Sequence, residues 1–210
     1  FDYINGFHDS ANSIATIVST QVLKPHQAVL WAAFFNFVAF LLFDAQVAKT
    51  IGTGIINPSI VDNTLLTSTL CGAIVWNLIT WWFGLPSSSS HALIGGLIGS
   101  GLMKGGFEIL VWKGIIKTSS FIIISPVIGL ILGFTLMVVV LNLFRHSNII
   151  KSNAIFKKLQ LLSAAIYSIS HGLNDAQKTM GIIALVLFSG GYLGSKFHIP
   201  FWVVLACHSV

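Results

Sequence analysis

Long apolar blocks, most of them close to the length that crosses a lipid bilayer, constrain this chain more than any other feature. The blocks run over residues 27–48, 65–84, 92–103, 121–144 and 159–193, and from residue 200 onward. An α-helix needs about 20 mostly apolar residues to span the hydrocarbon core. Only 8% of the 210 residues are charged, against about a quarter in an ordinary soluble domain. The sequence therefore predicts an all-α integral membrane protein.

The individual blocks predict different kinds of membrane segment. Those at 27–48, 65–84 and 121–144 each match one simple span. The block at 92–103 is too short to cross alone, which predicts a re-entrant or broken helix. Between blocks, Arg145, Lys151, Lys157 and Lys158 predict a basic cytoplasmic loop over 145–158. The other basic residues are dispersed, so the net charge of +5 does not indicate a nucleic-acid-binding surface.

A polar motif occurs twice and indicates an internal repeat. It reads NGFHDSANSIAT from Asn5 to Thr16 and HGLNDAQKTMG from His171 to Gly181, so that both copies contain Gly-x-x-Asp. Each copy interrupts an apolar context, as in transporters whose repeats contain discontinuous helices. We therefore predict a broken helix at each motif, with 1–144 as the first repeat and 159–210 as the start of the second.

Hydropathy leaves the orientation of the two repeats open. They are inverted if the block at 92–103 completes a crossing, and parallel if it only re-enters the membrane. The chain begins at Phe1 without an initiator Met and stops within an apolar run. We therefore expect a fragment that lacks both ends.

The two motif aspartates are candidates for a cation site. An aspartate inside a membrane segment costs about 2.5–3.5 kcal/mol on insertion scales, so it usually faces a partner or a water-filled cavity. The nearby carboxylate and amide oxygens offer hard ligands for sodium, or a carboxylate for a proton; they belong to Asp9, Asn12, Asn174, Asp175 and Gln177. The alternatives are a helix cap or pairing with a neighbouring lysine. Lys178 could neutralise Asp175 or face the substrate, and His8 and His171 are interpreted as structural hydrogen-bonding residues.

The second polar cluster is a serine run, Ser87 to Ser90, between Pro86 and His91. Proline disfavours helix in the residue before it and serine favours helix caps, so a helix should begin within the run. Its free N–H groups and hydroxyls would form an oxyanion site. A polar loop and an intramembrane serine hydrolase are the alternatives. No Gly-x-Ser-x-Gly motif surrounds the run, and adjacent residues point in different directions on a helix, so we expect no enzyme and no catalytic residues.

Three stretches resemble the PiT inorganic phosphate transporter family, also called phosphate permeases. They are NGFHDSANSIAT, GLPSSSSHALIGGLIGSG from Gly84 to Gly101, and SHGLNDAQKTMG from Ser170 to Gly181. The resemblance implies a helical transporter with inverted repeats and re-entrant hairpins. It also implies symport of inorganic phosphate with sodium or protons across the inner (cytoplasmic) membrane, and in proton-coupled members the substrate is a phosphate complexed with a divalent metal.

The resemblance also assigns site residues. It implies phosphate binding by Asn12, Ser87, Ser88, Ser89, Ser90 and Gln177, and cation coupling by Asp9, Asn174 and Asp175. No cofactor is expected beyond the transported ions. The expected partners are phosphate, the coupling cation and the lipid bilayer, and formation of a homo-oligomer is left open. The nearest alternative substrate is another oxyanion such as sulfate, because a cradle of hydroxyl and N–H groups recognises tetrahedral oxygens in general.

Overall fold

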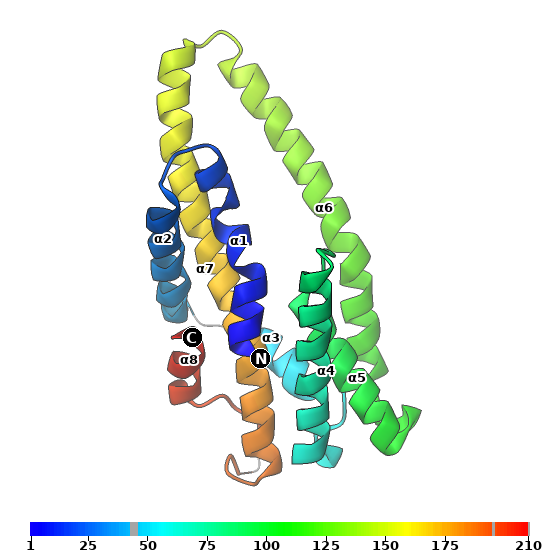
Figure 1. Cartoon of the computed structure of the whole chain (residues 1–210). Helices are drawn as coiled ribbons and strands as arrows, with labels where there is room; N and C mark the ends of the chain where they lie inside the picture. Colours follow the sequence, from blue (N-terminus) through cyan, green and yellow to red (C-terminus); the bar gives the residue numbers. More distant parts are fainter. Residues whose placement is uncertain (43–45, 195, 210) are drawn as a thin grey trace.

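The computed structural model describes residues 1–42, 46–194 and 196–209, and within them the regular elements are helices (Figure 1). Residues 43–45, part of the predicted 27–48 block, lie outside the described residues. The α-helices are α1 (Asp2–Ser19), α2 (Pro25–Val38), α3 (Gln46–Thr53), α4 (Asn63–Trp82), α5 (Ser89–Gly105), α6 (Trp112–Phe144), α7 (Ile149–Ser189) and α8 (Phe201–His208). Short 3-10 turns lie at Ala39–Leu42, Pro58–Ile60 and Phe107–Ile109. The prediction of an all-α fold is confirmed.

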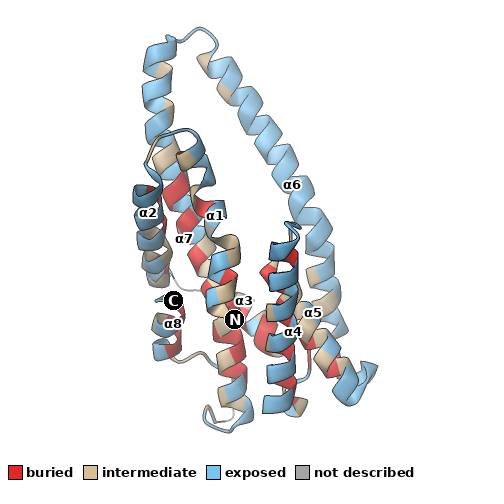
Figure 2. Ribbon diagram, in the orientation of Figure 1, coloured by how far each residue is buried: buried red, intermediate tan, exposed pale blue. Residues whose placement is uncertain are grey.

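Among the described residues, three helical segments are long and apolar enough to cross a membrane. They are Pro25–Leu42, Asn63–Trp82 and Trp112–Phe144, with mean hydropathies of 1.4, 1.3 and 2.6. They correspond to the three blocks that predict simple spans. No residue of α6 is buried, and most of this helix is exposed in Figure 2, with partly buried residues only near its two ends. An apolar helix that leaves most of its surface uncovered by protein is suited to contact lipid.

Helix α7 is the centre of the bundle and packs against α1, α2, α3 and α8. Helices α1 and α7 run in opposite directions along each other (Figure 1). At Gly172 the backbone of α2 comes so close that a Cβ atom would lie 2.6 Å from the carbonyl oxygen of Asn36. Gly181 makes a similar approach to α3, where a Cβ would lie 2.8 Å from the carbonyl oxygen of Ala48. Glycines of α7 thus allow its neighbours to pack closely.

The predicted breaks at the two Gly-x-x-Asp motifs are wrong. Helix α1 is continuous through Gly6 and Asp9, and α7 is continuous through Gly172 and Asp175. A glycine inside a helix costs only about 1 kcal/mol relative to alanine, and neither motif contains the proline that would remove a backbone hydrogen bond. The glycine and the polar residues of the second motif serve packing and side-chain contacts, which leave the helix intact.

The basic segment predicted as a loop over 145–158 is only partly a loop. Helix α6 ends at Phe144 and α7 already begins at Ile149. The side chain of Asn148 caps α7 by accepting hydrogen bonds from the backbone N–H of Ile150 at 2.9 Å and of Lys151 at 3.4 Å. Such a cap satisfies N–H groups that have no partner inside the helix, which explains why the helix starts so early.

Helices α4 and α5 form an antiparallel hairpin, so the short 92–103 block returns alongside α4 (Figure 1). At the tip, Gly84 adopts a positive φ of 63°, which lets the chain turn back. The arms touch at Gly96, where a Cβ would lie 2.7 Å from the carbonyl oxygen of Thr69. At the base, Lys104 Nζ lies 2.6 Å from Asp62 Oδ2. The hairpin is thus held at its base, and its tip lies beside α1.

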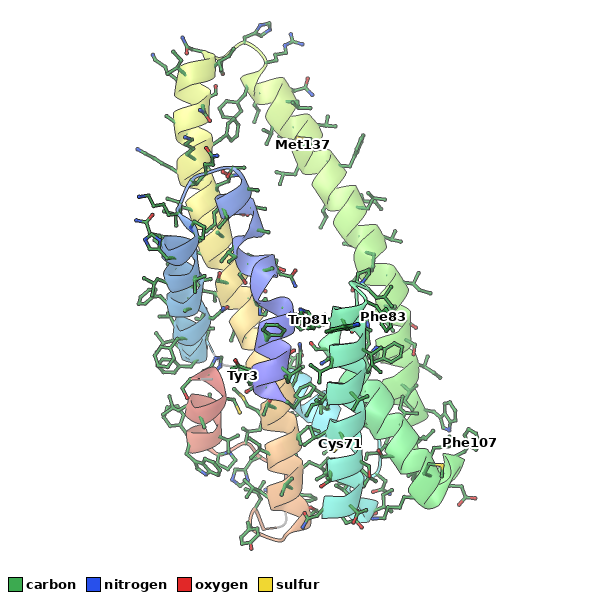
Figure 3. All side chains as sticks on the ribbon, viewed as in Figure 1. Tyr3, Cys71, Trp81, Phe83, Phe107 and Met137 are labelled. Atoms are coloured by element: carbon green, nitrogen blue, oxygen red, sulfur yellow. The ribbon has the colours of Figure 1, made fainter. Side chains whose placement is uncertain are left out.

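The hairpin tip contacts α1 through aromatic side chains. Trp81 and Phe83 lie at the end of α4 that faces α1 (Figure 3). The rings of Trp81 and Phe7 are tilted against each other, with centroids 5.2 Å apart. This contact brings the beginning of α5 next to the first Gly-x-x-Asp motif.

Candidate functional site

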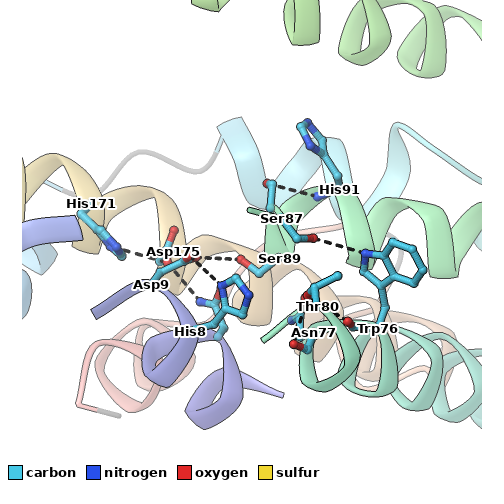
Figure 4. A network of polar contacts seen from close by, with 12 residues as sticks. His8, Asp9, Trp76, Asn77, Thr80, Ser87, Ser89, His91, His171 and Asp175 are labelled. Atoms are coloured by element: carbon cyan, nitrogen blue, oxygen red, sulfur yellow. Dashed lines mark hydrogen bonds and ion pairs between the residues drawn. The ribbon is translucent and has the colours of Figure 1, made fainter. Parts of the chain in front are cut away.

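Two aspartates, a lysine, an asparagine and a serine from three helices meet in one polar network (Figure 4). Helix α1 supplies Asn5 and Asp9, α5 supplies Ser89, and α7 supplies Asp175 and Lys178. Asn5 and Asp9 are four residues apart in α1, and Asp175 and Lys178 are three residues apart in α7. Residues at either spacing lie on the same face of a helix, so each motif presents its polar side chains together. The antiparallel packing of α1 on α7 then turns the two motifs toward each other.

Lys178 is the centre of this network. Its Nζ lies 2.8 Å from Asp175 Oδ1 and 3.9 Å from Asp9 Oδ2. It also donates to Ser89 Oγ at 2.9 Å and to Asn5 Oδ1 at 3.0 Å. The side chain is only 5% exposed, and a buried charge is tolerated where opposite charges and hydrogen bonds compensate it. Lys178 therefore pairs with both aspartates at once.

Ser89 and Asn5 complete the contacts between the helices. Ser89 donates from Oγ to Asp9 Oδ2 at 3.0 Å, so it links the hairpin to α1. Asn5 donates from Nδ2 to Asp175 Oδ2 at 3.1 Å, so it links α1 to α7. Both side chains are almost fully buried. Their hydroxyl and amide add hydrogen bonds to the carboxylates that Lys178 already pairs with.

A histidine accompanies each aspartate. His8 Nδ1 lies 3.3 Å from Asp9 Oδ1, and His171 Nδ1 lies 3.5 Å from Asp175 Oδ2. Each imidazole is mostly buried and contacts the carboxylate of its own motif. His8 is hydrogen-bonded to Asp9, whereas His171 also lines the cavities described below. The structural role of the two histidines stays a prediction.

The members of the serine run differ in their contacts. Ser88 is the N-cap of α5 and accepts from the backbone N–H of His91 at 3.5 Å, which confirms that a helix begins within the run. Ser87 Oγ accepts from the indole N–H of Trp76 at 3.2 Å, in the other arm of the hairpin. Ser89 points to the network, as described above. The start of α5 is therefore held by α4 through Ser87 and by α1 and α7 through Ser89.

An open polar cavity of about 360 Å³ adjoins the network. Its lining residues come from both motifs, the serine run and α7: Asp9, Asn12, Ser87, Ser88, Ser90, Tyr167, Ser170, His171, Asn174, Asp175 and Lys178. The N-terminus of α5 thus faces the same space as the two aspartates. A helix N-terminus carries about half a positive charge and unpaired N–H groups, which favour an anion. The cavity combines features that suit an oxyanion with features that suit a cation.

A second cavity, of about 310 Å³, shares His171 and Asp175 with the first. It is lined on α1 by Asp2 and Asn5. Asp175 is therefore accessible from two separate cavities.

Gln177 is the one predicted site residue that the structure does not bring to the network or to the 360 Å³ cavity. Its Oε1 accepts hydrogen bonds from the backbone N–H of Val47 at 2.9 Å and of Ala48 at 3.3 Å. The buried amide thus satisfies N–H groups in the first turn of α3, which have no partner within that helix. Its contacts orient α3 against α7.

The prediction of site residues missed Asn5, and it mentioned Lys178 as neutralising Asp175 or facing substrate without placing it among the site residues. A signal for Asn5 is present in the motif. Asn5 stands four residues before Asp9, as His171 stands four residues before Asp175. One helical turn separates each pair, so the repeat itself marks the position.

The chain is similar to known proteins over nearly its whole length. The model of the phosphate transporter family matches residues 5–153 and 145–210. A probable low-affinity inorganic phosphate transporter of Rhizobium meliloti (strain 1021) is 58% identical over 100% of this chain and 63% of its own length. One of Bacillus subtilis (strain 168) is 47% identical over 99% of the chain and 62% of its length. The chain thus spans a little over three fifths of these two relatives.

Two further proteins of lower sequence identity are also similar to this chain. The low-affinity inorganic phosphate transporter PitB of Escherichia coli (strain K12) is 35% identical over 89% of the chain and 43% of its own length. The solved structure of a sodium-dependent phosphate transporter superposes with a TM-score of 0.80, at 24% identity, over 99% of this chain and 70% of that one. This likeness shows a shared fold. On the family match and these identities, the chain belongs to the phosphate transporter family, a family of transporters and not of enzymes.

Proposed function

We propose that the protein carries inorganic phosphate across the inner membrane of a bacterium, as a multi-pass symporter coupled to sodium or protons. The observation that carries the proposal is the meeting of both motif aspartates and the N-terminus of α5 at one cavity. Membership in the phosphate transporter family supports the substrate, and the bacterial relatives support the membrane.

In this proposal phosphate occupies the end of the cavity formed by α5. Ser87, Ser88, Ser90 and Asn12 offer hydroxyl and amide groups beside the helix N-terminus. Hydrogen bonds to the charged oxygens of phosphate are short and strong, and the helix dipole adds to them. Ser89 acts behind this surface, because its hydroxyl already bonds Asp9 and Lys178.

The coupling cation follows from the charge of the anion. An uncompensated charge is strongly disfavoured in a low-dielectric interior, so phosphate needs positive charge beyond what a helix end offers. Asp9, Asp175 and Asn174 have the oxygen ligands for a cation at the same cavity. A site that binds the anion and the cation together couples phosphate uptake to the gradient of the cation.

The same proposal covers the architecture. The opposed directions of α1 and α7, which carry the two motifs, support inverted repeats. The α4–α5 hairpin is proposed as a re-entrant segment, since its polar tip lies beside the site and both arms end together at its base. In this arrangement α4 re-enters the membrane together with α5 and is not counted as a crossing, so a re-entrant 92–103 block is compatible with inverted repeats. Polar backbone at membrane depth is tolerated where it lines a cavity, as the serine run does here.

Uptake of radiolabelled phosphate tests the proposal. The full-length protein is produced in cells that lack their own phosphate transporters, and uptake is measured with sodium, with choline in its place, and with a protonophore. We expect uptake to fall when one of the two gradients is removed. We also expect unlabelled phosphate to compete better than sulfate. Uptake that survives the loss of both gradients, or that sulfate suppresses better than phosphate does, would contradict the proposal.

A further inference from the structure

The position of Lys178 has a consequence for ion coupling. Its ammonium nitrogen lies between oxygens of Asp175, Ser89, Asn5 and Asp9, from three different helices, at 2.8 to 3.9 Å. Carboxylate, amide and hydroxyl oxygens are also the ligands that hard metal cations prefer. Lysine's ammonium is a compact point charge, unlike the planar guanidinium of arginine. Lys178 thus occupies, with a covalently attached cation, the place where an ion would bind both aspartates.

The two motifs differ at this position. Lys178 stands three residues after Asp175, and the residue three after Asp9 is Asn12. Both residues line the 360 Å³ cavity. Asn12 is exposed, whereas Lys178 is buried against the aspartates. The repeat therefore offers a neutral amide in one copy and a fixed positive charge in the other.

We propose that Lys178 is a tethered cation that replaces one coupling ion at the Asp9–Asp175 pair. Lys178 would thus determine which ions the transporter requires, and this inference rests on the proposed function. A tethered charge does not have to be captured from solution, so it avoids the loss of translational freedom that a free ion suffers on binding. With Lys178 in place, the two aspartates keep one net negative charge for a single further cation. Without the Lys178 side chain, the two aspartates have the space and the negative charge to bind a second cation.

The test exchanges Lys178 for the residue of the other repeat. In Lys178→Asn both motifs carry asparagine, while Lys178→Arg keeps the positive charge and serves as the matched control. We expect sodium, compared with choline at equal ionic strength, to raise phosphate uptake by Lys178→Asn about tenfold more than it raises uptake by the wild type. The extra sodium dependence should be absent in Lys178→Arg, even if its larger head group lowers uptake.

Two other roles for Lys178 predict different results, and either result would overturn the proposal. If Lys178 binds phosphate directly, Lys178→Asn raises the KM for phosphate equally in sodium and in choline. If Lys178 only stabilises the fold, Lys178→Asn loses thermal stability and sodium does not restore it.

A binding measurement separates this inference from the proposed function and does not depend on transport. The Tm of the purified full-length protein, free of phosphate, is measured in detergent with sodium or with choline. We expect sodium to raise the Tm of Lys178→Asn more than that of the wild type, because the variant has room for one further ion and an ion stabilises the state that binds it. An equal rise in both proteins would overturn the proposal. A sodium dependence of the wild-type Tm that corresponds to more than one bound ion and that Asp175→Asn abolishes would also overturn it, even if no Lys178 variant folds. If the wild type carries no phosphate, the proposed function fails while this test still holds.

Discussion

At the scale of single residues, Ser89 has contacts that no neighbouring serine shares. It joins Asp9 to Lys178 and is 1% exposed. In Ser89→Ala both charged groups lose a buried hydrogen bond, which costs about 1–3 kcal/mol, or roughly a 5- to 150-fold loss of uptake. Ser120→Ala on the exposed surface of α6 is the control, because Ser120 donates to the carbonyl of Ile116 within its own helix. Equal phosphate uptake by both variants would show that the network has no role in transport.

Gln177 provides a second residue-scale prediction, in which sequence and structure differ. The resemblance to known transporters places it at phosphate, whereas its Oε1 contacts the N–H groups of α3. Loss of such a contact lowers stability by about 1 kcal/mol. We therefore expect Gln177→Ala to lower the Tm of the detergent-solubilised protein without changing the KM for phosphate. A raised KM at unchanged Tm would support the direct role in phosphate binding.

Residues differ in how far their partners could be predicted. The cap made by Ser88 lies within one turn of the run that predicts it, so local rules suffice. Gln177 and Val47 are 130 positions apart, and Asn5 and Asp175 are 170 apart. Such pairs depend on how helices pack, which no local pattern contains. The motifs therefore predict the chemistry of the site but not the partner of each side chain.

At the scale of the helices, the two motif glycines have different surroundings. A Cβ at Gly172 would meet the backbone of Asn36, whereas a Cβ at Gly6 would meet no atom within 4 Å. Overpacking costs about 1–3 kcal/mol, while Gly to Ala in an open helix gains up to about 1 kcal/mol. We expect Gly172→Ala to lower the Tm in detergent and Gly6→Ala, the matched control, to keep or raise it. The reverse order would contradict the packing of α2 on α7.

The base of the hairpin has a predicted pH dependence. The hydrogen bond from Lys104, together with the backbone N–H of Leu65, holds the pKa of Asp62 below the ordinary value of 3.8. Because the folded-state pKa is lowered, the stability that the Asp62 carboxylate contributes is fully present above pH 3.8 and is lost as the pH falls through the lowered pKa.

Asp62→Asn tests this dependence, because asparagine also caps helices but cannot form the ion pair. We expect the Tm of the wild type to exceed that of Asp62→Asn at neutral pH and the difference to vanish in acid below the lowered pKa. The difference should also shrink at high salt, since the pair is partly exposed. A difference that grows on acidification would contradict this assignment.

The helices also show why part of the fold escaped prediction. Apolar length and composition predict that α2, α4 and α6 are long and apolar enough to cross a membrane, because these properties depend on the segment alone. The motif glycines look like helix breaks in sequence, yet Gly172 is needed because α2 packs against it. Only the neighbouring helix distinguishes the two uses of a glycine.

At the scale of the whole molecule, antiparallel packing of α1 on α7 and the α4–α5 hairpin bring three distant parts of the chain to one cavity. The repeat in the sequence predicts that the two motifs belong together. It leaves their relative orientation open, because that depends on the path of the chain through the hairpin. We propose that this shared cavity serves phosphate and its coupling cation.

Phosphate uptake by Asp9→Asn and by Asp175→Asn tests this role of the cavity. Glu108→Gln is the matched control, since it removes a carboxylate that is exposed near the base of the hairpin, outside the cavity. We expect each aspartate variant, inserted in the membrane at wild-type levels, to lose nearly all phosphate uptake, while Glu108→Gln keeps it. Uptake at the wild-type rate in either aspartate variant would rule out a role for the shared cavity in transport.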